Sequence, residues 1–189
     1  MTRLGSSIYR IKAIETVYAK FNFRSRLEAR WAAFFDLLKW QWNYEPVDLP
    51  GWIPDFSIGI IGTLVEVKPF IRAEQWEETA KKIAKAMDAG DRHNDVVLLG
   101  ESPLWHKEPS YGNRYGFVIG WILLQDFEWT HMPYPEKASA DCRTLNAVEG
   151  GWVNRITGNE SGKDAHPYDT TTNYKEMWAD ACNLTQWRK

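Results

Sequence analysis

The sequence predicts an α+β fold (α/β in the broader classification), ordered helix, three-strand antiparallel meander, helix and strand, with helices flanking a mixed sheet. Two segments, residues 26–39 and 73–89, repeat apolar side chains with a period near 3.6 residues, which is typical of amphipathic helices. Three short segments rich in aromatic and β-branched residues lie between those helices. A continuous apolar run at residues 95–100 then indicates a strand buried on both faces.

The composition is that of an ordinary globular protein. The chain has 189 residues, 44% of them hydrophobic and 25% charged, so disorder, collagen-like sequence and coiled coil are excluded. Its 23 Lys and Arg against 25 Asp and Glu give a formal net charge of −2, so any nucleic-acid contact must rest on local basic patches. We find neither an apolar run long enough for a membrane span nor a signal peptide, and expect a cytoplasmic protein with no membrane partner.

The first helix is predicted over residues 26–39, with Ser25 as its N-cap. Its apolar stripe consists of Leu27, Trp31, Phe34, Phe35 and Leu38. Residues 41–45, 52–58 and 63–68 follow as consecutive antiparallel strands, separated by Pro50-Gly51 and by the glycines at 59 and 62.

The second helix, residues 73–89, ends at Gly90. It is long enough to serve as a crossover, so the strand at 95–100 is predicted to run parallel to an earlier one. Residues 117–124 predict a further strand of the same sheet, and residues 171–185 predict a last helix.

The two parts of the chain differ in character. Residues 1–124 form the predicted core. Residues 125–189 form a C-terminal elaboration, loop-rich to about residue 170 because of its many Gly, Pro and small polar residues, and packed on the same domain.

The third strand carries the most informative residues. Glu66 and Lys68 are two apart, so they project from one face of the strand while Val65 and Val67 project from the other. A meander folds Asp55 back beside Glu66, which brings two carboxylates and one ammonium together. Mg²⁺ favours such oxygen donors, and a nearby ammonium can stabilise charge that develops on a phosphate.

Two structural alternatives compete with this interpretation. Glu66 and Lys68 could belong to the solvated face of an antiparallel sheet, and Asp55 could be a turn residue. Glu28, at the edge of the first helix's apolar stripe, is a further candidate metal ligand. Since Ser25 and Glu28 also match a capping box, the sequence leaves the two roles of Glu28 equally open.

These residues resemble the PD-(D/E)XK nuclease superfamily. The resemblance covers about residues 23–100. It rests on Glu28 in an early helix, Pro54-Asp55 in one strand and Glu66-Val67-Lys68 in the next. The surrounding sequence, from Phe23-Arg-Ser-Arg-Leu-Glu onward, is similar to small bacteriophage-encoded members and to the endonuclease subunit of some transposons.

The resemblance implies a restriction-endonuclease-like core and a hydrolase that cleaves DNA, as an endonuclease, with Mg²⁺ or Mn²⁺. Asp55 and Glu66 would then be metal ligands, Lys68 the catalytic lysine and Glu28 an accessory acidic residue on the metal. Some phage relatives carry paired cysteines in the C-terminal half, whereas here only Cys142 stands there, so no zinc is predicted.

Two basic groups are candidate nucleic-acid contacts. The first comprises Arg24, Arg26 and Arg30, and the second comprises Lys81, Lys82 and Lys85. The lysines could equally form an ordinary solvated helix face.

Three other functions stay open at this point. They are a junction-resolving nuclease, which would be a homodimer, a nucleic-acid-binding or protein-binding module that has lost catalysis, and a glycosidase using Asp55 and Glu66 as acid and base. The adjacent Lys68 fits the glycosidase chemistry poorly. The sequence names no partner protein.

Overall fold

The structure is a computed structural model, and it describes residues 13–70, 76–92, 94–103, 108–110, 114–116, 118–123, 136–139, 147–148, 151–153, 160–161 and 174–186. Most of the stretch predicted to be loop-rich, the start of the predicted second helix, and Cys142 lie outside these residues. Within the described part, no helix is both long and apolar enough to cross a membrane.

Three α-helices are present in the described residues: α1 (Arg26–Leu37), α2 (Glu77–Ala89) and α3 (Tyr174–Leu184). The central sheet contains β3 (Trp42–Tyr44), β4 (Phe56–Ile58), β5 (Thr63–Val67), β6 (Val96–Leu99), β9 (Val118–Leu123) and β10 (Glu136–Ser139). The smaller sheets are made of β1 (Thr16–Tyr18), β2 (Phe21–Phe23), β7 (Glu108–Ser110), β8 (Arg114–Gly116), β11 (Ala147–Val148), β12 (Gly151–Val153) and β13 (Glu160–Ser161).

The central sheet is mixed and has the strand order β10-β9-β6-β5-β4-β3. The pairs β3–β4 and β4–β5 are antiparallel, which confirms the predicted meander. Strand β6 runs parallel to β5, as the crossover through α2 requires, and β9 pairs antiparallel with β6. Strand β10, from the region assigned to the C-terminal elaboration, extends this same sheet. The protein therefore has the predicted α+β order of elements.

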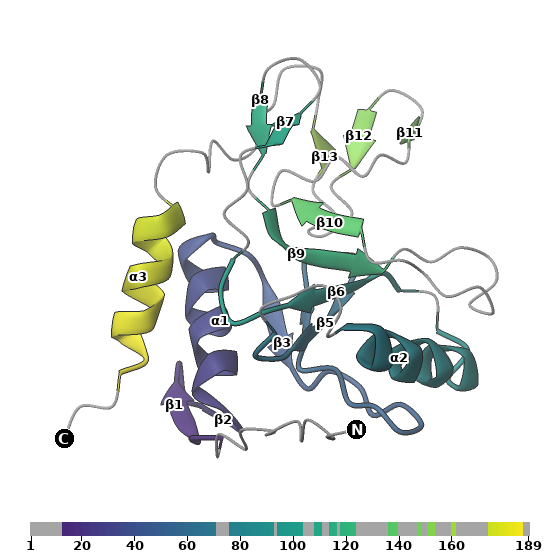
Figure 1. The fold of residues 1–189 in the computed structure, drawn as a ribbon, viewed down its shortest axis with the longest axis horizontal. Helices are drawn as coiled ribbons and strands as arrows, with labels where there is room; N and C mark the ends of the chain where they lie inside the picture. Colours follow the sequence, from purple (N-terminus) through teal and green to yellow (C-terminus); the bar gives the residue numbers. More distant parts are fainter. Residues whose placement is uncertain are drawn as a thin grey trace, which may run out of the picture.

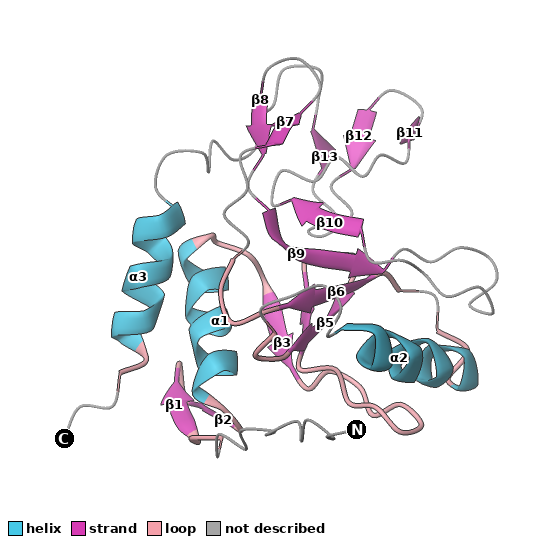
Figure 2. Ribbon diagram, viewed as in Figure 1, coloured by secondary structure: helices cyan, strands magenta, loops and turns pink. Residues whose placement is uncertain are grey.

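The helices form layers around the sheet (Figures 1 and 2). Helix α1 lies on one face with α3 alongside it, and α2 lies on the opposite face. The β1–β2 hairpin packs near one end of α1.

The second meander strand is shorter than the predicted 52–58, because it begins only at Phe56. Leu49 and Trp52 exchange two backbone hydrogen bonds of 2.9 and 3.0 Å around Pro50-Gly51. Gly51 takes a φ of +84°, which suits the second central position of a tight turn. Trp52 thus belongs to this turn rather than to the strand.

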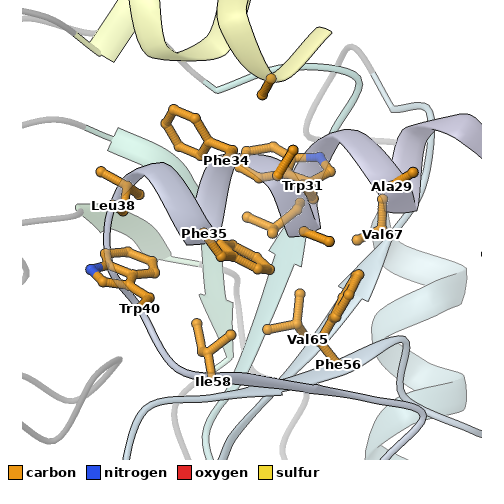
Figure 3. Close-up of a cluster of buried hydrophobic side chains, with 14 of the residues drawn as sticks. Ala29, Trp31, Phe34, Phe35, Leu38, Trp40, Phe56, Ile58, Val65 and Val67 are labelled. Atoms are coloured by element: carbon orange, nitrogen blue, oxygen red, sulfur yellow. The ribbon is translucent and has the colours of Figure 1, made fainter. Parts of the chain in front are cut away.

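A dense aromatic core fills the space between α1 and the sheet. Figure 3 shows Phe35 of α1 above Phe56 and Val65 of β4 and β5, with Trp31 and Phe34 directed toward α3. The alternation of β5 is as predicted, because Val65 and Val67 face this cluster whereas Leu64 faces the second cluster under α2.

Helix α3 is attached to this core chiefly through Trp178. Its ring centroid lies 4.7 Å from that of Trp31 and 5.5 Å from that of Phe34.

We expect Trp178→Ala to lower the free energy of unfolding by roughly 3–5 kcal/mol, since it removes a large buried ring. Leu184→Ala, at an exposed site of the same helix, should change it by less than about 0.5 kcal/mol. Urea denaturation of both variants checks this, and equal effects would contradict the packing of α3.

Candidate active site

Two acidic side chains meet where β4 begins and β5 ends. Phe56 pairs with Val65, so the antiparallel register places Asp55, just before β4, opposite Glu66. Both carboxylates are almost fully buried, Asp55 at 2% exposure and Glu66 at 3%. The alternative of a solvated sheet face is therefore wrong, because the face that carries Glu66 lies under the apolar cluster of α2.

The two oxygens of Asp55 have different partners. Oδ2 accepts a hydrogen bond of 2.7 Å from the backbone N–H of Val67. Oδ1 accepts one of 3.0 Å from Nη2 of Arg24, which also makes an ion pair. The side chain of Asp55 thus binds across to β5, which is not the local contact expected of a turn residue.

The two oxygens of Glu66 also have different partners. Its Oε2 accepts a hydrogen bond of 2.8 Å from the indole Nε1 of Trp52, and its Oε1 lies 2.5 Å from Nζ of Lys68. The Lys68 ammonium also lies 3.3 Å from the carbonyl oxygen of Val67. Each buried carboxylate therefore has one oxygen fixed by a neutral N–H group and the other satisfied by a cation.

Trp52 is a site residue that the sequence analysis missed. The Leu49–Trp52 turn described above brings its indole to Glu66. Its only sequence signal is its position after Pro50-Gly51, which predicts a turn but not the contact made by the side chain.

Glu28 makes one of the two contacts of a capping box, because its backbone N–H binds the Ser25 side chain, whereas its carboxylate contacts the Ser25 hydroxyl and the Arg24 N–H. Ser25 Oγ accepts a bond of 3.1 Å from the Glu28 N–H, and the same hydroxyl donates to Glu28 Oε1 at 2.7 Å. Glu28 Oε2 accepts from the hydroxyl of Tyr44 at 2.8 Å and from the N–H of Arg24 at 3.2 Å. Both of its oxygens are thus occupied by protein groups. Its metal-binding role stays a prediction.

Arg24 links this network to Asp55. Its side chain joins Asp55 and Glu45, with Nε lying 2.9 Å from Glu45 Oε1. The side chain of Arg24 is 55% exposed although its partner Asp55 is buried. Arg24 was predicted from the sequence only as part of a basic patch, and Glu45 had no predicted role.

Burial has the largest effect on the pKa of Asp55. Desolvation and, after it, the negative charge of Glu66 together raise this pKa to about 7, against the opposing effect of Lys68. Burial alone would lower the pKa of Lys68, but the charges of Asp55 and Glu66 outweigh it and hold that pKa above its usual value. Lys68 is therefore an ammonium at neutral pH.

The predicted basic groups do not gather at one place. Arg24 contacts Asp55, whereas Arg30 lies close enough to Cys182 of α3 to influence its pKa. Arg26 and Arg30 are both half-buried on α1. The second group, Lys81, Lys82 and Lys85, is exposed on α2, and Lys81 pairs with Glu77 at 2.6 Å.

The donor set suits a hard cation. Across the described residues, no group of three or more His, Cys, Asp and Glu side chains is arranged to hold a metal ion. Mg²⁺ is commonly held by one or two carboxylates together with waters and substrate phosphates. Asp55 and Glu66 meet that requirement, since each has one oxygen that a partly exposed cationic side chain, rather than the backbone or Trp52, occupies.

Compared with family models, with curated proteins and with solved structures, the chain has no match.

The Trp52–Glu66 hydrogen bond can be tested with a matched pair of variants. Trp52→Phe keeps most of the ring but removes the indole N–H that donates to Glu66, so we expect a loss of roughly 1–3 kcal/mol in unfolding free energy. Trp42→Phe removes an indole bond of 2.8 Å to the exposed Asp36, where water can replace it, and should cost less than about 1 kcal/mol. Equal losses in urea denaturation would contradict the buried contact.

The raised pKa of Asp55 makes stability depend on pH. The folded chain binds this proton more tightly than the unfolded chain, whose Asp titrates near 3.8, so stability falls as the pH rises from about 4 to about 7. Relative to Asp55→Asn, the free energy of unfolding of the wild-type protein should therefore fall by on the order of 2 kcal/mol between pH 5 and pH 8.

Denaturation in EDTA at both pH values measures this difference. Asp88→Asn, at an exposed site of α2, should instead follow the wild-type protein. A difference between Asp55→Asn and wild type that stays constant with pH would show that the pKa is not raised.

Proposed function

We propose that this chain is a Mg²⁺-dependent DNA nuclease of the PD-(D/E)XK type, with Mn²⁺ able to substitute. One observation carries the proposal. Asp55 and Glu66 are buried together, each is oriented by a neutral N–H group, and each is neutralised at its other oxygen by a cation, with Lys68 beside them.

The fold supports the same proposal. The order α1, β3–β4–β5, α2, β6 agrees with the order that the resemblance implies, in which the acidic residues lie on the second and third strands. Asp55 stands immediately before β4 and Glu66 lies within β5, which agrees with that arrangement.

Asp55 and Glu66 would hold the metal ion through the oxygens now paired with Arg24 and Lys68. The ion supplies a Lewis acid that lowers the pKa of a bound water and neutralises charge on the phosphate. Asp55 must be ionised to bind, so metal affinity should increase as the pH rises through about 7.

Lys68 would contribute as a cation. The charges of Asp55 and Glu66 hold its pKa above its usual value, and the ammonium would stabilise negative charge as the phosphodiester bond breaks. Its side chain is 42% exposed, which lets the ammonium reach a substrate phosphate without leaving the site.

The test is cleavage of circular single-stranded DNA, supercoiled plasmid, linear duplex and a four-way junction in Mg²⁺, Mn²⁺ or EDTA. We expect metal-dependent cutting by the wild-type protein, and Lys68→Ala should lower kcat by about 10²–10³ because a preorganised cation is removed. Asp55→Asn should abolish cutting at every metal concentration that supports the wild-type protein.

Asp88→Ala and Lys20→Ala, which remove charges of the same signs at exposed sites, should cut normally. Circular dichroism establishes that each variant is folded. Cutting retained by both Lys68→Ala and Asp55→Asn would place catalysis elsewhere. Absence of cutting by wild type, with DNA binding equal in all variants, would replace the nuclease by a binding module.

A further inference from the structure

Arg24 is an exposed cation that pairs with one buried carboxylate and one partly exposed carboxylate. Its Nη2 lies 3.0 Å from Oδ1 of Asp55, and its Nε lies 2.9 Å from Oε1 of Glu45. Asp55 is only 2% exposed, whereas the Arg24 side chain is 55% exposed. A buried carboxylate is therefore neutralised by a group that can leave it at little desolvation cost.

Resting on the proposed function, we propose that Arg24 is the resident counter-cation of the site. It holds Oδ1 of Asp55 until a divalent cation takes that oxygen. The guanidinium then keeps its contact with Glu45 and offers its remaining N–H groups to a DNA phosphate, for which its planar fork is well suited.

Glu45 is built to retain Arg24. Its φ of 45° lies in the left-handed region, which is uncommon for a residue other than Gly and is disfavoured further before Pro46. Its backbone N–H donates to the carbonyl of Asp55 at 3.0 Å, which holds the segment in this conformation. Strain of this kind persists where surrounding contacts fix it, often at functional sites.

The exchange follows from electrostatics. Two cations at one carboxylate oxygen repel each other, so binding of the ion and the Arg24–Asp55 contact oppose each other. The coupling is reciprocal. If the Arg24–Asp55 contact weakens binding of the ion, then binding of the ion must weaken the Arg24–Asp55 contact by the same free energy. Removal of Arg24 should therefore tighten binding of the ion and weaken binding of DNA.

The experiment is a calorimetric titration of the full chain with Mn²⁺, without DNA, at pH 8.5, where Asp55 is largely ionised. We expect Arg24→Gln to lower the Kd for Mn²⁺ roughly two- to fivefold, the range given by an ion pair with one exposed partner. Lys20→Gln, which removes the same charge at an exposed turn, should leave the Kd unchanged. Arg24→Lys keeps the charge but has one nitrogen for two carboxylates, so its Kd should lie between the two.

The affinity for DNA should change in the opposite direction to the affinity for Mn²⁺. In Ca²⁺, Arg24→Gln should bind a mixed-sequence oligonucleotide more weakly than wild type, with the slope of its salt dependence reduced by about one phosphate contact. A purely structural role for Arg24 would not give tighter ion binding together with weaker DNA binding.

The outcomes separate this inference from the proposed function. If Mn²⁺ binding is lost in Asp55→Asn but Arg24→Gln binds Mn²⁺ no tighter than wild type, the exchange is overturned and the metal site stands. If wild type and Asp55→Asn bind Mn²⁺ alike, the metal site itself fails and the exchange fails with it.

Discussion

Burial of two carboxylates side by side is the constraint on which the rest of the site depends. Asp55 and Glu66 come together because the β4–β5 register places them opposite each other, and burial leaves little of either carboxylate open to solvent. Four contacts to the two carboxylates offset the free-energy cost of this burial: they come from the Val67 N–H, the Trp52 indole and the two cations. The free energy for this arrangement comes from the packed core on both faces of the sheet.

The same network joins the site to the start of α1. Arg24, immediately before the N-cap Ser25, gives its side chain to Asp55 and its backbone N–H to Glu28 and Tyr44. The position of the helix and the charge on Asp55 are thus coupled through one residue. This explains how Glu28 can act on the site without touching a metal, since its charge also raises the pKa of Asp55.

The order of elements could be predicted from the sequence because periodicity reports burial directly: the stripe of α1, the apolar run of β6 and the N-cap Ser25 all appear as expected. The meander register also follows from short turns, so Asp55 and Glu66 could be placed together. Trp52 and Glu45 could not be predicted as site residues. Local pattern indicates a turn before Trp52 but not the contact that its side chain makes, and it does not indicate the left-handed backbone position of Glu45. The solvated-face alternative was wrong for a related reason: α2 covers that face, and coverage is a tertiary property.

A purely structural salt-bridge network would be built differently. Buried ion pairs seldom stabilise a fold more than apolar residues of the same size, so their presence needs another reason. Here the burial is one-sided: the carboxylates are enclosed, whereas the side chains of Arg24 and Lys68 are 55% and 42% exposed. Cations held in this way can exchange for another cation while the carboxylates stay fixed by Val67 and Trp52. That asymmetry favours a site that binds a further cation over a salt-bridge network that only stabilises the fold.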